Sequence, residues 1–102
     1  MPAVVHVVLL RLREETDVIT LFRELASLRH RIPGLLSFSG GENNSPEGIS
    51  RGFTHAFSMT FESPEARDAY LPHPEHERVK ALVLAAIAPG ETPGVCAVDY
   101  AL

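Results

Sequence analysis

The sequence predicts an α+β domain in which a four-stranded antiparallel sheet carries helices on one face, in the order β-α-β-β-α-β. Four short segments rich in β-branched and aromatic residues predict the strands. Two longer segments repeat apolar residues every three or four positions, which is typical of helices packed on a core. The 102 residues suffice for one core, so we expect residues 1–102 to form a single domain.

The first strand is expected at residues 3–12, AVVHVVLLRL, where valines dominate and no glycine or proline interrupts the run. Alternation places its side chains on two opposite faces. One face carries Val4, His6, Val8, Leu10 and Leu12, and the other carries Val5, Val7, Leu9 and Arg11. Both sets are mostly apolar, which indicates that something covers each face of the sheet.

The first helix is expected at residues 18–32. Asp17 or Thr16 is suited to cap its start, and Pro33 and Gly34 end it. Its side chains form one apolar stripe, which consists of Val18, Leu21, Phe22, Leu25, Leu28 and Ile32. This stripe is expected to face the sheet.

Two further strands flank a polar loop. Residues 35–40, LLSFSG, are the second expected strand, with Leu36 and Phe38 on one face. Residues 40–52 form a glycine-rich polar loop. The third strand is expected at residues 53–62, and one of its faces carries His55, Phe57, Met59 and Phe61.

The second helical segment is broken by prolines. Ser63 is suited to cap it and Pro64 fits the first helical position, but Pro72 interrupts it. The helix restarts at Pro74, since a first-turn position needs no amide hydrogen. Its inward stripe is expected to be Val79, Leu82, Val83, Ala86 and Ile87. Residues 94–100, GVCAVDY, form the last expected strand.

This order of elements is the split βαβ, or ferredoxin-like, arrangement, which places the helices on one face of the sheet. The opposite face keeps the apolar residues of the first strand, with Val98 and Tyr100 as expected neighbours, and no further element covers it. Exposed apolar surface costs about 25 cal/mol per Å², and monomers rarely leave such patches open. We therefore expect a homodimer in which two sheets pack face to face as a dimeric α/β barrel.

Charge and composition argue against several classes of partner. The net charge is −4, and the densest basic group, residues 29–31, falls at a helix end, so we expect no nucleic-acid partner. Cys96 is the only cysteine, which excludes a disulfide within the chain. The apolar N-terminal run is too short to span a bilayer and lacks the features of a signal peptide. We expect a soluble, cytoplasmic protein without a membrane partner.

The segment DAYLPHPEH, residues 68–76, is either a proton-transfer site or only a joint between two helices. His76 falls in the first turn after the break and leans toward the inward stripe. His73 lies at the helix start, where we expect it to hydrogen-bond the nearby backbone. Two histidines three residues apart resemble metal ligands only loosely, and no third ligand has a motif. We expect no metal and no cofactor.

Two more histidines, His6 and His55, lie on apolar strand faces that meet the helices. Each needs a hydrogen-bond partner there, so each is either a satisfied core residue or part of a site. Asp99, beside Tyr100 in the last strand, is an unusual acid in an apolar segment. Histidine and tyrosine are therefore the candidate proton carriers.

Four segments together resemble a known family, over nearly the whole chain. HVVLLRL, IPGLLSFSGGEN, GFTHAFSMTFES and DAYLPHPEH, in this order, are similar to the stress-responsive α/β-barrel, or Dabb, domain. The resemblance implies a ferredoxin-like fold and a dimer whose two sheets wrap into a barrel. Most members have no assigned reaction, but one plant member is a polyketide cyclase that works without a cofactor. Carried over from that cyclase, the base falls on His76, its partner on Tyr70 and a further pocket histidine on His6.

The chemistry of these three candidate catalytic residues is reasonable. A neutral imidazole with a pKa near 6.5 can take a proton from carbon acidified by flanking carbonyls. A phenol can donate a hydrogen bond to the enolate oxygen. We expect a pocket lined by Val8, Leu10, Leu21, Phe22, Leu25, Phe57, His55 and His73. If Phe57 and Met59 fill that space instead, the motif belongs to the scaffold.

Three functions stay open from the sequence. The first is a Dabb-type homodimer with an apolar ligand pocket and no catalysis. The second is a cofactor-independent cyclase or lyase that uses the histidine and tyrosine on a polyketide-like carbonyl compound. The third is a ferredoxin-like monooxygenase that acts without a metal on oxygen-reactive phenols. The expected ligand is a small apolar carbonyl or aromatic compound.

Overall fold

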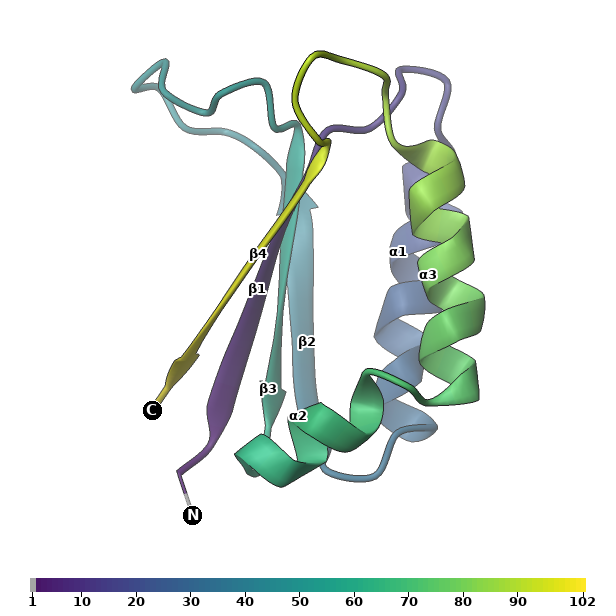
Figure 1. Cartoon of the computed structure of the whole chain (residues 1–102). Coiled ribbons are helices and arrows are strands. Elements are labelled where there is room, and N and C mark those ends of the chain that lie inside the picture. Colours follow the sequence, from purple (N-terminus) through teal and green to yellow (C-terminus); the bar gives the residue numbers. More distant parts are fainter. Residues whose placement is uncertain (1) are drawn as a thin grey trace.

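The structure, a computed structural model, describes residues 2–102, which form a four-stranded antiparallel sheet with helices on one face (Figure 1). The strand order is β2-β3-β1-β4, so the predicted ferredoxin-like α+β fold is confirmed. The elements are β1 (Val4–Leu10), α1 (Val18–Ser27), the 3₁₀ helix η1 (Leu28–His30), β2 (Leu35–Glu42), β3 (His55–Phe61), α2 (Pro64–Tyr70), α3 (Pro74–Ala86) and β4 (Val95–Ala101).

The core lies between the sheet and the helices. Leu10 of β1 and Met59 and Phe61 of β3 are fully buried there, as alternation along both strands predicts. Leu25 of α1 and Val79 of α3 close the core from the helical side. β1 occupies a central position, paired on one side with β3 and on the other with β4. The side chains of β1 are therefore placed next to those of two partner strands.

The three α-helices that the structure describes within residues 2–102 each begin with a side-chain cap. The amide of Thr20 donates to Asp17 at 3.1 Å at the start of α1, and the amide of Ala66 donates to Ser63 at 3.1 Å at the start of α2. The amide of Glu75 donates to Nδ1 of His73 at 3.1 Å, which caps α3. The predicted backbone hydrogen bond of His73 is thereby confirmed.

The first helix is shorter than predicted. α1 ends at Ser27, and the chain tightens into η1 before it reaches Ile32. The hydroxyl of Ser27 donates to the carbonyl of Glu24 at 2.7 Å and so competes for the last carbonyls of the helix. A 3₁₀ turn is a common way to finish a helix. Leu28 and Ile32 are nevertheless buried, so the predicted apolar stripe still faces the core after the α-helix gives way to the 3₁₀ turn.

The predicted pairing of Leu36 and Phe38 on one face of β2 is wrong. The register of β2 against β3 shifts between Leu35 and Ser37, which marks a β-bulge. As a result Leu35 is buried, Leu36 is 54% exposed, and Phe38 packs against the core. A bulge inserts one residue, so the alternation counted along the sequence changes sides at this point.

The predicted inward stripe of α3 is narrower than expected. Val79 and Val83 are buried, while Leu82 is 43% exposed. Successive residues of an α-helix are about 100° apart, which follows from 3.6 residues per turn. Leu82 therefore lies on the flank of the line that joins Val79 and Val83. Ala86 and Ile87, the other two residues of the predicted stripe, are partly buried and also pack against the core.

In the described part of the chain, no helix covers the second face of the sheet (Figure 1). Val98 and Tyr100 of β4 are 60% and 52% exposed there. They pair with Val7 and Val5 of β1, as alternation predicts. The loop between β2 and β3 reaches out on the side away from the helices (Figure 1). Among residues 2–102, no helix is long and apolar enough to cross a bilayer.

Candidate functional site

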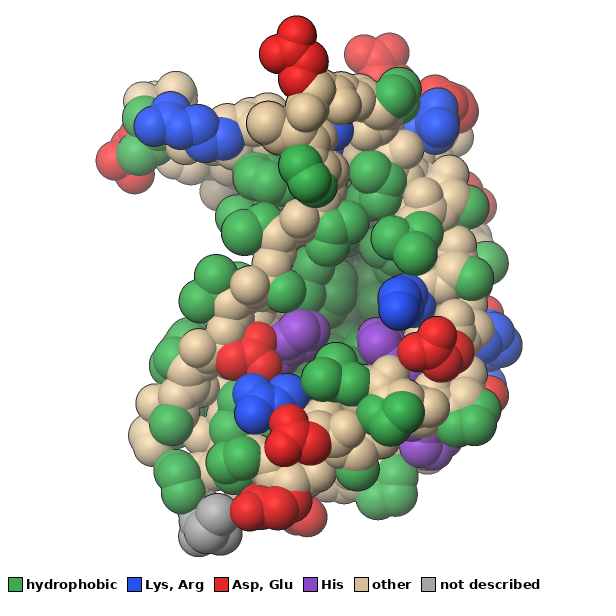
Figure 2. All heavy atoms as spheres, viewed as in Figure 1, with side chains coloured by type: hydrophobic (Ala, Val, Ile, Leu, Met, Phe, Trp, Pro, Cys, Tyr) green, Lys and Arg blue, Asp and Glu red, His purple; other side chains and the backbone are tan. Residues whose placement is uncertain are grey.

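A cavity of about 280 Å³ lies between the sheet and the helices α2 and α3. Figure 2 shows it as a hollow floored by hydrophobic side chains, with histidine side chains at one end. Apolar residues of β1, α1, β3, α3 and β4 supply most of its walls. The polar side chains that reach it are those of His6, Tyr70, His76 and Lys80.

The break between α2 and α3 positions two of these groups. Tyr70 is the last residue of α2, and His76 lies in the first turn of α3. The ring centres of Tyr70 and His76 are 4.2 Å apart, and those of Tyr70 and His6 are 6.2 Å apart. The three residues predicted to be catalytic therefore lie together, although they come from β1, α2 and α3.

His76 has a defined tautomer. Its Nδ1 lies 2.8 Å from the carbonyl oxygen of Leu71. Because a carbonyl oxygen can only accept, Nδ1 must carry the hydrogen, which leaves Nε2 as the basic nitrogen. Burial lowers the pKa of His76 and outweighs the hydrogen bond to Leu71, which acts in the opposite direction. The imidazole is therefore neutral at neutral pH.

His6 is held by a carboxylate. Its Nδ1 lies 2.6 Å from Oδ1 of Asp99, and Nη1 of Arg67 donates to Oδ2 of Asp99 at 2.8 Å. Partial burial acts to raise the pKa of Asp99, but the hydrogen bonds from His6 and Arg67 together outweigh it. The pKa of Asp99 is thus below its ordinary value, and the ionised carboxylate accepts from Nδ1 of His6. In the neutral imidazole, Nε2 is then free.

Tyr70 is 2% exposed, yet its hydroxyl has no hydrogen-bond partner in the described part of the chain. Every side-chain nitrogen or oxygen that is fully sealed from solvent there does have a partner. The hydroxyl of Tyr70 must therefore keep access to the cavity. Burial raises the pKa of Tyr70, so the phenol stays protonated and can donate.

Asp99 and Arg67 are site residues that the sequence did not predict. Asp99 was an unusual acid in an apolar strand, and its partner was unknown. In the β1–β4 register Asp99 stands directly opposite His6, and both side chains project from the helical face. Register-matching of the first and last strands could have found this pair. Arg67 lies one helical turn before Tyr70, but nothing in its local sequence marks it.

The predicted pocket lining is only partly in this cavity. Val8, Leu25 and Phe57 line it. Leu10 and Leu21 are buried in the core and do not line this cavity. Phe57 lines the cavity without filling it, and its ring also packs against Phe38 at 5.7 Å between centres.

Three other residues assigned to the pocket lie elsewhere. Phe22 packs against Phe38 and His55, with ring centres 6.3 and 5.8 Å apart. Nδ1 of His55 lies 2.8 Å from Oγ1 of Thr54, beyond the cavity. His73 faces the start of α3, where it caps the helix. Strand and helix periodicity gives the correct face for Phe22 and His55, but it does not locate them along that face.

The histidines of the helix break are engaged in local hydrogen bonds. Nδ1 of His73 accepts from the backbone and Nδ1 of His76 donates to it. Within residues 2–102, no group of three or more histidine, cysteine, aspartate or glutamate side chains is placed to hold a metal ion.

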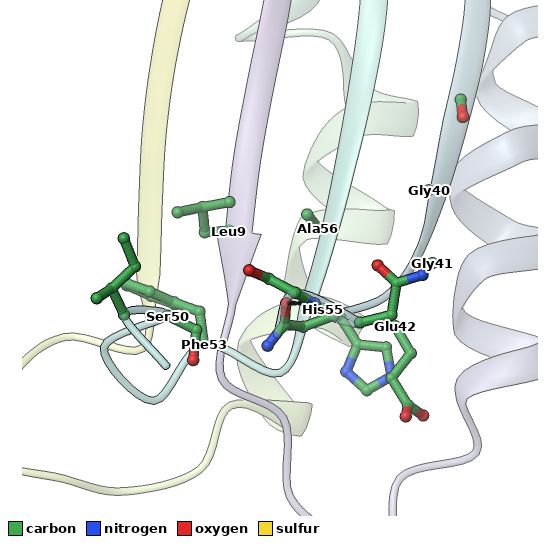
Figure 3. Close-up of a pocket in the computed structure, with 13 residues that line it drawn as sticks. Leu9, Gly40, Gly41, Glu42, Ser50, Phe53, His55 and Ala56 are labelled. Atoms are coloured by element: carbon green, nitrogen blue, oxygen red, sulfur yellow. Dashed lines mark hydrogen bonds between the residues drawn. The ribbon is translucent and has the colours of Figure 1, made fainter. Parts of the chain in front are cut away.

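A second hollow, of about 510 Å³, lies on the opposite side of the sheet. Figure 3 shows Leu9 and Ala56 of the sheet near Ser50 and Phe53 of the β2–β3 loop. His55 also borders this hollow, whereas His6, Tyr70 and His76 do not. The three candidate proton carriers therefore gather in the cavity under the helices.

The fold and this cavity define a ferredoxin-like α+β domain with a small-molecule-sized space between sheet and helices. Residues 4–102 match the family model of the stress responsive A/B barrel domain, Dabb. A stress-response A/B barrel domain-containing protein of Arabidopsis thaliana is 37% identical over 83 residues, which cover 80% of this chain and 75% of that protein. The chain belongs to the Dabb family.

Two further relatives bear on assembly and chemistry. A dimeric ferredoxin-like protein of unknown function from Jannaschia sp. has a TM-score of 0.80 and 30% identity, and the match covers 96% of this chain and 97% of that one. The olivetolic acid cyclase of Cannabis sativa is 29% identical over 77 residues, which cover 72% of this chain and 76% of that protein.

Proposed function

We propose that this Dabb protein is a homodimer that binds a small, mostly apolar carbonyl compound in the cavity and moves a proton on it without a cofactor. One observation carries the proposal. The cavity gathers a neutral imidazole with a free Nε2, a phenol with an unpartnered hydroxyl and a second imidazole held by a carboxylate. Its 280 Å³ is near the lower end of the range of about 300–1,000 Å³ usual for ligand sites, which suits a compact ligand.

The dimer forms through the helix-free face of the sheet. Val98 and Tyr100 leave an apolar surface on this face that a second sheet can cover. The Jannaschia relative, a dimeric ferredoxin-like protein at 30% identity, supports a dimer for this chain as well. Because the cavity lies on the other face, dimerisation leaves it open to a ligand.

In the proposed reaction, Nε2 of His76 takes a proton from a carbon between two carbonyl groups. The electron pair of the broken C–H bond moves onto a carbonyl oxygen and forms an enolate. The hydroxyl of Tyr70 donates a hydrogen bond to that oxygen as its charge develops. The raised pKa of Tyr70 favours this role, because the phenol remains a donor rather than a base.

His6 is proposed to orient the carbonyl compound. Asp99 fixes its ring through Nδ1, which leaves Nε2 available to a hydroxyl or enol group of the ligand. The olivetolic acid cyclase relative supports chemistry of this class, since its name denotes a ring-closing enzyme. For the present chain, the enolate would then attack a second carbonyl of the same molecule or return the proton.

Hydrogen–deuterium exchange tests the proton-transfer step without knowledge of the natural ligand. 1-Phenylbutane-1,3-dione carries an acidified methylene group, whose exchange in D₂O can be followed by ¹H NMR at mildly acidic pH. The protein should accelerate this exchange over the buffer rate. His76→Gln should reduce the acceleration by about 10²–10⁴-fold, the usual contribution of a general base.

His30→Gln is the matched control, because His30 is an exposed histidine of η1 outside the cavity. This variant should exchange the diketone as fast as the wild type. If the wild type gives no acceleration, or if His76→Gln retains it while folded, His76 is not a base. Ligand-induced shifts without exchange would instead mark a binding protein.

A further inference from the structure

We propose that the ligand of this cavity carries a carboxylate, which Lys80 binds at the cavity rim. The inference rests on the proposed function and narrows its substrate class to carbonyl compounds with a carboxylate at one end. The apolar part of the ligand then lies on the cavity floor, and its carboxylate points toward solvent.

Charge is the first observation behind this inference. The described lining of the cavity contains no aspartate, glutamate or arginine, and Lys80 is its only lysine. Asp99 lies behind His6 and is paired with Arg67. No carboxylate of the lining therefore competes for the ammonium group, and a ligand anion finds a positive charge at the edge of an apolar space. Figure 2 shows a basic side chain beside the hollow.

Position is the second observation. Lys80 follows His76 by four residues on α3, so the two side chains project from the same side of the helix. Burial is the main cause of the lowered pKa of His76, and the positive charge of Lys80 acts in the same direction. The spacing of four residues corresponds to about 6 Å along the helix axis. A ligand that reaches both groups thus has its carboxylate a few bonds from the reacting carbon.

The side chain of Lys80 is also free to bind. Its nearest carboxylate is Glu77, at 3.9 Å, and both side chains are about half exposed. Exposed pairs at that distance hold each other weakly. Lys80 is, moreover, the only lysine of the chain, since the other eight of the nine basic residues are arginines. The single lysine of the sequence thus lies at the cavity rim.

A carboxylate fits this site better than a phosphate. Phosphate sites usually combine several donors, such as an arginine fork, a helix N-terminus or a glycine-rich loop. Lys80 offers one point charge, and the other polar groups of the cavity are a phenol and two imidazoles. One positive charge balances one carboxylate, while Tyr70 and the histidines remain available to the carbonyl groups.

Calorimetric titration with matched probes tests the inference. The probes are 4-phenylbutanoate, its methyl ester and 4-phenylbutyl phosphate, which share one apolar body. The acid should bind the wild-type dimer more tightly than the ester does. Lys80→Met should weaken binding of the acid by about three- to tenfold and leave the ester unchanged, whereas Lys80→Arg should retain most of the affinity.

Arg29→Met is the control, because it removes an exposed positive charge away from the cavity. It should leave the affinity for 4-phenylbutanoate unchanged. Equal affinity of acid and ester, or an unchanged affinity in Lys80→Met, overturns the role of Lys80 but leaves the cavity as a ligand site. Tighter binding of the phosphate ester overturns the choice of carboxylate. If no probe binds and no histidine resonance shifts, the proposed function fails as well.

Discussion

The helix-covered face and the helix-free face of the sheet differ in how their side chains are satisfied. On the covered face, His6 has Asp99 at 2.6 Å, and Asp99 has Arg67 at 2.8 Å. On the other face, Val98 and Tyr100, the two neighbours of Asp99 in the chain, are more than half exposed. Three consecutive residues of β4 thus contribute to both faces of the sheet, the middle one to the cavity side and its two neighbours to the helix-free side.

This difference follows from the period of a strand. Successive side chains point to opposite faces, so a site anchor and an assembly surface can share one strand without contact. A partly buried carboxylate persists only when it is paired and hydrogen-bonded, whereas an apolar side chain at an open face needs only a partner surface. Substitutions of adjacent residues should therefore separate the chemistry of the protein from its assembly.

The largest expected difference between the two faces is in the free energy of unfolding, and substitutions of the two tyrosines of the chain should reveal it. Tyr70→Ala should lower the free energy of unfolding by about 3–5 kcal/mol, because it leaves a cavity among buried aromatic rings. Tyr100→Ala should cost less than about 1 kcal/mol within the protomer, since Tyr100 is half exposed and its contribution falls on association. Urea denaturation at protein concentrations low enough to dissociate the dimer measures both. Equal losses would mean that the two faces do not differ as described.

Tyr70→Phe sharpens this comparison. It keeps the packing and removes only a hydroxyl that has no protein partner in residues 2–102. Stability should change by less than about 1 kcal/mol, while deuterium exchange of the diketone should slow by about 10²-fold or more if the hydroxyl stabilises the enolate.

The next effect concerns assembly. Val98→Glu places a charge on the helix-free face and should raise the dimer dissociation constant by about 100-fold or more, which corresponds to about 2.7 kcal/mol. Sedimentation equilibrium measures it. Ile19→Glu, a similar change at an exposed position of α1, should leave the dimer intact. If the wild type is a monomer at micromolar concentration, the assembly proposed here is wrong.

Asp99→Asn should have a smaller effect that depends on pH. The pKa of Asp99 is lower in the folded protein than in the unfolded chain, because the bonds from His6 and Arg67 outweigh the opposing effect of partial burial. Its stabilisation is complete above about pH 4 and is lost as the pH falls through the folded-state pKa.

The wild type should therefore exceed Asp99→Asn by about 1–2 kcal/mol at pH 7, and this gap should narrow below pH 4. Denaturation curves at pH 7, 5, 4 and 3 provide the measurement. A gap that stays constant across this range would show that the charge of Asp99 contributes no stability.

His73→Ala should have the smallest effect. It removes the cap of α3 and should cost about 1 kcal/mol. Because His73 does not line the cavity, the affinity for 4-phenylbutanoate should not change. A combined thermal melt and calorimetric titration checks both parts. A loss of affinity at unchanged stability would show that His73 contributes to ligand binding and not to the helix cap.

Local patterns in the sequence predicted most of the fold. The caps at Asp17, Ser63 and His73 and the break at Pro72 are short-range features, and each lies where predicted. Leu36 was misplaced because a bulge reverses alternation without changing composition. Periodicity describes a regular element but does not show where the regularity stops.

The candidate site was predictable only in part, for a reason of distance along the chain. Tyr70 and His76 lie six residues apart, and one helix break brings their rings within 4.2 Å. His6 and Asp99 are separated by 93 residues, and their contact depends on the register of β1 against β4. No local pattern fixes that register, so Asp99 gained a role only once the strands were paired.

The most direct test of the central claim is a measurement of the imidazole nitrogens of His6 and His76. Long-range ¹H–¹⁵N NMR spectra report which nitrogen of each ring carries the hydrogen, and a pH titration reports the pKa of His76. We expect the Nδ1-protonated tautomer in both rings, and a pKa of His76 below the ordinary 6.5 because burial disfavours its charged form. Hydrogen on Nε2 of His76, or titration of that ring at or above 6.5, would contradict a free base facing the cavity.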